Sequence, residues 1–183
     1  MKPLYLLIAI LLVIAGTVLV VHLYSRRTSA VPAVHVENGF EFTVHGPYDK
    51  VAPLFGAHGE RAWGGEHWNP QFLHPQPAQD VEGEVFTVAH GHTRSTWVNT
   101  AFDLQSGHVQ YVYVIPDIQA VLIDIHLRHD DPAITEVKVV YERTALTPSS
   151  NAHVYELGQK DAASAAEWQT AIERYLGVIK TKP

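Results

Sequence analysis

The chain has 183 residues, of which 46% are hydrophobic and 17% charged, a composition typical of a folded chain and not of a disordered one. Its formal net charge is -6, and no basic stripe alternates with aromatic residues, so nucleic acid is excluded as an expected partner. The chain has no cysteine, which excludes disulfides, thiol nucleophiles and cysteine metal ligands.

The N-terminal segment differs from the rest of the chain. Residues 4–21 are almost wholly Leu, Ile, Val and Ala. As a helix, about 20 such residues span a hydrocarbon core of roughly 30 Å. The sequence therefore predicts a single-pass transmembrane anchor over residues 1–24, which contacts the membrane through residues 3–23. A tether over residues 25–36 is expected to follow it.

A cleaved signal peptide is the alternative interpretation of this segment. Thr28-Ser29-Ala30 offers a small-residue cleavage site, but Arg26 and Arg27 precede it, where a signal peptide prefers neutral polar residues. The basic residues on the two sides of the apolar run nearly balance, so the positive-inside rule leaves the side of the membrane open.

Residues 37–183 are enough for one domain with its own core. A first strand is expected over 40–45, then short helical pieces from Pro47 to Trp68 and a proline-rich loop over 69–82. Hydrophobic residues then alternate with a period of two, which predicts consecutive antiparallel strands joined by short turns. Those strands are expected over residues 85–89, 96–104, 109–115, 121–128 and 137–146, with a turn at 129–132.

The last segment is predicted to be one long amphipathic helix that begins near Asp161 or Ser164. Its apolar residues recur at helical spacing, which requires a partner surface, and the sheet is the only large candidate. The expected stripe consists of Ala165, Trp168, Ile172, Tyr175 and Ile179. The predicted fold class is therefore α+β, a curved antiparallel sheet wrapped on a long C-terminal helix and preceded by the transmembrane helix.

Several short motifs occur in the order found in a bacterial subgroup of the START-like superfamily. This superfamily is also called SRPBCC, polyketide cyclase-like or birch-pollen-allergen-like, and its architecture is the helix-grip fold. The sequence resembles it over roughly residues 38–178 in the motifs Glu60-Arg61-x-Trp63, Trp68-x-Pro70, Gly83-x-Val85-Phe86, Thr96-Trp97, Tyr113-x-x-Pro116, Thr135-x-Val137-x-Val139-x-Tyr141, Thr144-Ala145-Leu146, Trp168-x-x-Ala171-Ile172 and Tyr175-Leu176.

The resemblance implies a cavity between the sheet and the last helix that holds apolar molecules. The residues permit it, because Tyr and Trp join an apolar body to a polar tip and suit mostly apolar pockets. Plain core packing is the alternative role for any one of these aromatic residues. A cavity of about 300 Å³ or more is expected. The candidate ligand-binding residues are Trp63, Trp68, Trp97, Tyr111, Tyr113, Ile123, Tyr141 and Trp168.

The other polar residues of interest are not assigned to a catalytic or metal site. Glu60 and Arg61 are expected to form a solvated charged pair, with a place at the cavity mouth as the alternative. His90-x-His92 has a spacing that can bind zinc, but the spacing fixes no third ligand and Gly91 predicts a turn, so no metal and no cofactor are expected. Neither a phosphate loop nor a nucleophile elbow nor an HExxH motif is present, and no catalytic residue is predicted.

The favoured function is membrane-anchored binding of a hydrophobic small molecule or lipid, without turnover. A cyclase, dehydratase or hydrolase acting in the same cavity is one alternative. The other is an accessory membrane protein without a ligand, and this alternative replaces ligand binding if the space between the sheet and the last helix is packed solid, with no pocket of about 300 Å³ or more.

Overall fold

The structure, a computed structural model, describes residues 15–17 and 31–179. The chain divides into two units, Met1–Pro32 and Ala33–Pro183. Within the first unit, residues 15–17 are helical, and the rest of the predicted anchor lies outside the described residues. Over the described ranges, no helix is both long and apolar enough to cross a membrane. The anchor stays a prediction.

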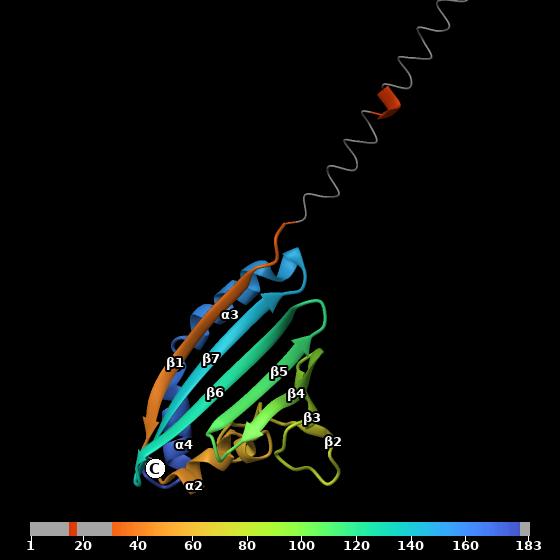
Figure 1. The fold of residues 1–183 in the computed structure, drawn as a ribbon. Coiled ribbons are helices and arrows are strands. Elements are labelled where there is room, and N and C mark those ends of the chain that lie inside the picture. The colour runs from red at the N-terminus through yellow and green to blue at the C-terminus, as the bar shows by residue number, and fades with distance from the viewer. Residues whose placement is uncertain (1–14, 18–30, 180–183) are drawn as a thin grey trace, which may run out of the picture. The chain divides into compact units, whose positions relative to one another are not determined.

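The second unit is built on one seven-stranded antiparallel sheet in the order β1-β7-β6-β5-β4-β3-β2 (Figure 1). Strands β3 to β7 follow each other through short turns, and β1 pairs with the last strand, β7. This arrangement confirms the predicted antiparallel sheet. The strands are β1 (His35–Val44), β2 (Gln71–His74), β3 (Val85–His90), β4 (Thr93–Asp103), β5 (His108–Ile115), β6 (Gln119–Asp131) and β7 (Ile134–Ala145).

Helical segments connect the strands and close the chain. Between β1 and β2 lie α2 (Tyr48–Val51), η1 (Ala52–Phe55) and η2 (Gly59–Ala62), the short pieces that the sequence predicted. After β7 come η3 (Pro148–Ser150), α3 (Asn151–Asp161) and α4 (Ala165–Tyr175). Figure 1 shows α3 and α4 behind β1 and β7; α3 contacts both strands, and α4 contacts β1.

The prediction of one long C-terminal helix is wrong, because α3 and α4 are separate. In a continuous helix the backbone N–H of Ser164 would donate to the Lys160 carbonyl. Instead this N–H donates to the Asp161 carbonyl at 3.0 Å, and the Ser164 hydroxyl donates to the Lys160 carbonyl at 3.2 Å. The serine side chain thus takes the place of the helical bond, which explains the break at this point.

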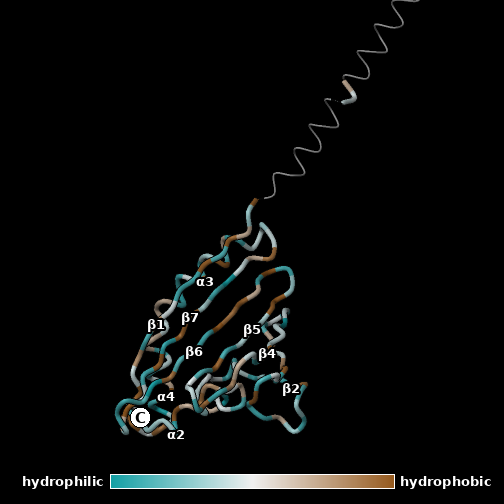
Figure 2. The backbone as a smooth tube through the Cα atoms, in the orientation of Figure 1, coloured by the Kyte–Doolittle hydropathy of each residue, from teal (hydrophilic) through white to brown (hydrophobic). Residues whose placement is uncertain are grey.

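Alternation along the strands separates a buried concave face from an outer face. On β6 the odd-numbered residues from Val121 to Leu127 are buried, whereas Asp124 is partly exposed and His126 and Arg128 are exposed. Figure 2 shows hydrophobic and hydrophilic positions interspersed along the strands. This period of two is the pattern from which the strands were predicted.

The apolar stripe of the last helix differs from the predicted one at its end. Ile172 is fully buried, and Ala165, Trp168 and Leu176 pack against the core. Tyr175 is 54% exposed, so its predicted place in the stripe is wrong. Leu176, four residues after Ile172, packs against the core instead, and the predicted stripe does not reach Ile179, because α4 ends at Tyr175.

Two predicted loops contain strand. The proline-rich segment 69–82 holds the short edge strand β2, where Phe72 pairs with Phe86 of β3. An edge strand tolerates flanking prolines, since one side makes no ladder bonds. The predicted turn at 129–132 is shorter than expected, because β6 continues to Asp131, which pairs with Ile134.

Candidate functional site

A cavity of about 140 Å³ lies on the concave face of the sheet, where Trp168 of α4 is one of its lining residues. Its lining is mostly aromatic and includes one carboxyl group. Six of the eight candidate residues predicted from the sequence line it, and Glu60 and Ile125 are added. The lining residues are Glu60, Trp68, Trp97, Tyr111, Ile123, Ile125, Tyr141 and Trp168.

Strand register brings the floor of this cavity together. Tyr111 on β5 is opposite Ile123 on β6, and Ile123 is opposite Tyr141 on β7. All three therefore form one row across the sheet and point to the same face. Ile125 follows on the same face of β6, and Trp168 reaches over the row from α4.

Two candidate residues, Trp63 and Tyr113, support the wall of the cavity and do not line it. The Trp63 ring lies 5.2 Å from the ring of Trp168, and its Nε1 donates to the Leu54 carbonyl at 2.7 Å. The Tyr113 ring stacks on Trp97 with ring centroids 4.0 Å apart. The ligand-binding role of all eight residues remains a prediction.

The cavity is smaller than the expected 300 Å³, and aromatic packing is the reason. The Trp168 ring contacts Phe40 at 5.3 Å and Phe55 at 6.4 Å in addition to Trp63. Trp68 meets Trp97 edge to face at 5.5 Å, and its Nε1 donates to the Ala57 carbonyl at 3.0 Å. The segment between α2 and β2 thus fills the space with the rings of Trp63 and Trp68.

Glu60 supplies the carboxyl group of the cavity. Burial, and secondarily the charge of Asp80, raise the pKa of Glu60 to about 8. The expected Glu60–Arg61 charged pair is wrong, because Arg61 instead donates to the Pro70 carbonyl at 2.6 Å and lies over the Phe72 ring at 4.9 Å. At pH 7 the Glu60 carboxyl is therefore mostly neutral and able to donate a hydrogen bond into the cavity.

A second acid, Glu84, is fully buried beside β3. Neither of its carboxyl oxygens has a hydrogen-bond partner among the described residues. Burial, followed by the charge of Asp80, raises the pKa of Glu84 to about 8. Asp80 accepts hydrogen bonds from the backbone N–H of His58 at 2.6 Å and of Gly59 at 3.1 Å. Asp80 is thus the hydrogen-bonded carboxylate whose charge acts on both Glu60 and Glu84.

A buried polar cluster under α3 was not predicted from the sequence. The Arg143 guanidinium on β7 binds both oxygens of Asp161 at 2.5 and 2.7 Å and donates to the Tyr113 hydroxyl at 2.8 Å and to Gln119 Oε1 at 3.3 Å. Bidentate geometry and these further bonds compensate the cost of burying the charges. Arg143 occupies an inward position of an alternating strand, a signal that could have found it.

His90 and His92 lie apart from the three side chains that could together hold a metal among the described residues. His90 Nε2 lies 2.9 Å from Ser95 Oγ, which also accepts a bond from Trp97 Nε1 at 2.6 Å. Gly91 has φ 61° and places His92 in the turn after β3, as predicted. Among the described residues, neither histidine belongs to a group of three or more side chains that could hold a metal, and the same is true of His67 and His74.

A larger hollow, of about 370 Å³, lies on the outer face over β1, β7 and β6. It is open and mostly polar, and its charges neutralise one another, since Lys138 lies 3.6 Å from Glu41 and Arg128 lies 3.6 Å from Glu136. Ligand pockets are mostly apolar with a few polar groups, which favours the smaller concave cavity as the candidate site.

Comparison with known proteins gives no matching family model and no matching curated protein. Solved structures do match. Truncated norcoclaurine synthase from Thalictrum flavum has a TM-score of 0.58 at 14% identity and covers 84% of this chain and 99% of its own. A protein from Thermobifida fusca has a TM-score of 0.58 at 14% identity, covering 80% of this chain and 97% of its own. Ara h 8.0201 has a TM-score of 0.54 at 15% identity and covers 80% of this chain and 100% of its own. At such identities the likeness shows the fold alone.

Proposed function

We propose that this chain, which has the START-like helix-grip fold, binds a small aromatic molecule of about one ring between the sheet and α4. One observation carries the proposal: a cavity of about 140 Å³ whose lining is three tryptophans, two tyrosines, two isoleucines and a single carboxyl group. Such a lining offers dispersion contacts on several sides and one polar atom that can orient the ligand.

The volume sets the size of the ligand. A cavity of about 150 Å³ lined by apolar side chains is known to hold benzene, whereas pockets for drug-sized molecules occupy roughly 300–1,000 Å³. The sequence-based proposal of a hydrophobic small molecule or lipid is therefore narrowed to the small molecule. A structure of norcoclaurine synthase from Thalictrum flavum with the same fold is in complex with dopamine and hydroxybenzaldehyde, each of them a one-ring aromatic molecule, and this supports an aromatic ligand.

Glu60 is proposed to contact the polar group of the ligand. Because its pKa is raised to about 8, the neutral form predominates at pH 7 and can donate a hydrogen bond to a hydroxyl or carbonyl oxygen. Tyr111 and Tyr141 also line the cavity, but burial first of all raises the pKa of each well above its usual value, so both stay neutral. Glu60 is thus the one lining group that titrates near neutral pH, and the lining holds no second group with which it could form the acid–base pair of a cyclase, dehydratase or hydrolase.

An accessory protein without a ligand is the second candidate function. The observation that favours it is the volume, which is below the expected 300 Å³. In that case the aromatic residues serve as core alone, and the surface of the domain carries the function.

Calorimetric titration with phenol separates the two candidates. We expect saturable binding of one phenol per chain, and we expect Ile123→Trp to weaken it at least about 10-fold by filling the cavity, which corresponds to about 1.4 kcal/mol. Leu122→Trp is the matched control, since Leu122 is the neighbouring residue on the opposite face of β6. Absence of binding to the wild type supports the accessory protein instead, and an equal loss in both variants contradicts binding in the concave cavity.

Membrane attachment through residues 3–23 is also part of the proposal. Its support is the uninterrupted apolar run at residues 4–21. We expect the full-length chain to stay in the membrane pellet after carbonate extraction. Release of a chain whose mass lacks residues 1–30 contradicts the anchor and indicates a cleaved signal peptide.

A further inference from the structure

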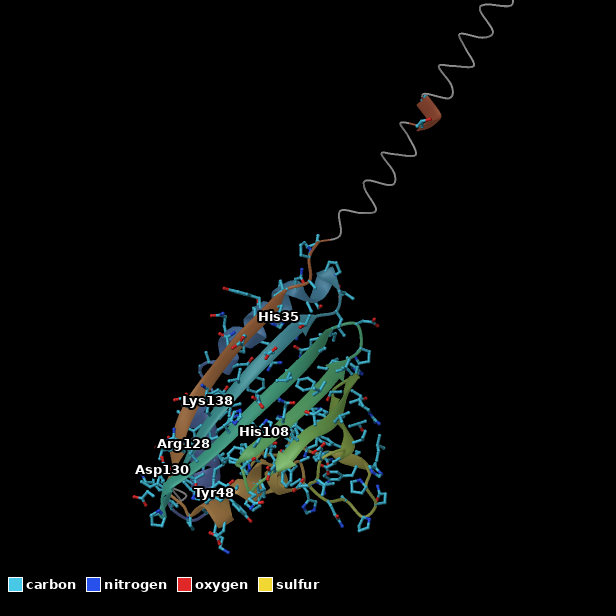
Figure 3. All side chains as sticks on the ribbon, in the orientation of Figure 1. His35, Tyr48, His108, Arg128, Asp130 and Lys138 are labelled. Atoms are coloured by element: carbon cyan, nitrogen blue, oxygen red, sulfur yellow. The ribbon has the colours of Figure 1, made fainter. Side chains whose placement is uncertain are left out.

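Two histidines and one aspartate meet on the outer face of the sheet. His108 on β5 is directly opposite His126 on β6, and their rings stack 4.9 Å apart at an angle of 6°. Asp124 lies two residues before His126 and so shares its face. Each imidazole presents its Nε2 atom to a different oxygen of this carboxylate, at 2.7 Å from His108 and 3.0 Å from His126. Figure 3 labels His108 on this face.

We propose that His108, Asp124 and His126 bind a divalent transition-metal ion, for which Zn²⁺ is the probe. The ligand atoms of the three side chains all lie within 4.8 Å of one another. Two imidazole nitrogens and a carboxylate oxygen form a ligand set typical of zinc, with bonds of about 2.1 Å that separate the ligand atoms by about 3.4 Å. The present nitrogen–oxygen distances need to open by only several tenths of an ångström.

The surrounding residues hold this arrangement in place. Gln110 Nε2 donates to Asp124 Oδ1 at 3.1 Å, and Thr100 Oγ1 donates to Gln110 Oε1 at 2.9 Å. These bonds orient the carboxylate, as the outer partners of metal ligands commonly do. The backbone is fixed as well, because β5 and β6 pair without a shift from His108–His126 to Ile115–Gln119.

The neighbouring cations do not prevent metal binding. Lys138 is opposite His126 on β7 and lies 3.6 Å from Glu41, and Arg128 lies 2.6 Å from Asp130. Each cation near the site is thus paired with a carboxylate. Figure 3 shows Arg128, Asp130 and Lys138 on the same side of the sheet as His108.

Solvent can reach the proposed site. The side chains of His108 and Asp124 are 32% and 25% exposed, and that of His126 is 51% exposed. Three protein ligands leave a fourth position of a tetrahedral ion open to water or to another molecule. This proposal replaces the sequence-based expectation that no metal binds, and its ligands are different histidines from the His90–His92 pair.

Zinc titration of the purified full-length chain, after metal removal with a chelator, tests the site. We expect one Zn²⁺ per chain by calorimetry, with an affinity at least about 10-fold weaker in His126→Gln and in Asp124→Asn. Gln110→Ala should weaken binding less, because it removes only the orienting bond. His92→Gln is the matched control, since it changes an exposed turn histidine and should leave the affinity unchanged.

Imidazole NMR signals of the wild-type chain give a second measurement that does not depend on any variant. Zn²⁺ should shift the ring signals of His108 and His126 ahead of those of the other histidines. The proposal is overturned if no stoichiometric binding occurs up to about 1 mM Zn²⁺. It is equally overturned if His126→Gln and Asp124→Asn bind as tightly as the wild type, or if other histidines shift first, which places the ion elsewhere.

Discussion

The two faces of the same sheet carry opposite chemistry, and β6 contributes to both. Its inward residues Ile123 and Ile125 line an aromatic cavity, while the alternate residues Asp124 and His126 belong to a partly exposed polar cluster. Both candidate sites follow from the period of two. At the inner site, apolar and aromatic side chains pack together and exclude water. At the outer site, side chains with complementary hydrogen-bonding atoms meet.

Two carboxyl groups, Glu84 and Asp124, show how the different surroundings on the two faces change a pKa. Glu84 is buried and has no partner among the described residues, so burial raises its pKa to about 8. Burial also acts to raise the pKa of Asp124, but hydrogen bonds from His108, Gln110 and His126 outweigh it and hold that pKa below its usual value. The availability of partners, more than burial itself, decides the direction of the shift.

The largest expected change in stability comes from removing an aromatic ring that packs against the inner face of the sheet. Trp168→Ala should lower the free energy of unfolding by about 3 kcal/mol, because its ring contacts Phe40, Phe55 and Trp63. Tyr175→Ala on the same helix is the control and should change stability by about 0.5 kcal/mol or less, since Tyr175 is 54% exposed. Urea denaturation measures both. A loss below about 1 kcal/mol for Trp168→Ala would place this tryptophan outside the core.

A smaller change in stability is expected from Glu84, the buried acid without a hydrogen-bond partner among the described residues. The pKa of Glu84 is raised from 4.5 in the unfolded chain to about 8 in the folded one, so the folded state binds the proton more tightly. Its contribution to stability is therefore full below pH 4.5 and is lost as the pH rises through 8, with a slope of at most about 1.4 kcal/mol per pH unit.

Glu84→Gln removes this pH dependence. The variant should nearly match the wild type near pH 4.5 and exceed its stability by about 2 kcal/mol near pH 6, as urea denaturation at several pH values would measure. Glu82→Gln, at a neighbouring exposed position, should follow the wild-type curve. Parallel curves for Glu84→Gln and the wild type would mean that Glu84 is ionised or solvated in the folded protein.

Local pattern was enough to predict the strands and much of the inner site. The alternation of β5, β6 and β7 placed Tyr111, Ile123 and Tyr141 on one face, and six candidate residues do line one cavity. The volume was not predictable in this way. It depends on how the rings of Trp63, Trp68 and Phe55 meet, and sequence spacing does not contain that information.

Features that depend on specific side-chain contacts were missed. The outer cluster joins His108 to Asp124 and His126, and its detection requires the register of β5 against β6. The break between α3 and α4 depends on the side-chain bond of Ser164, which a helical pattern does not reveal. Glu60 and Arg61 were both singled out in the sequence. Their side chains do not pair, because the fold of η2 and the position of Pro70 bring the Arg61 guanidinium to the Pro70 carbonyl.

The four tryptophans offer the most direct test of the central claim, that the concave cavity is a binding site for a one-ring molecule. Phenol should be titrated into ¹⁵N-labelled full-length protein while the indole N–H signals and the imidazole signals are followed. We predict that the signals of Trp68, Trp97 and Trp168 shift together and saturate, while those of His108 and His126 on the outer face stay fixed. Indole signals that do not move up to about 10 mM phenol, or shifts confined to the outer face, would contradict the account.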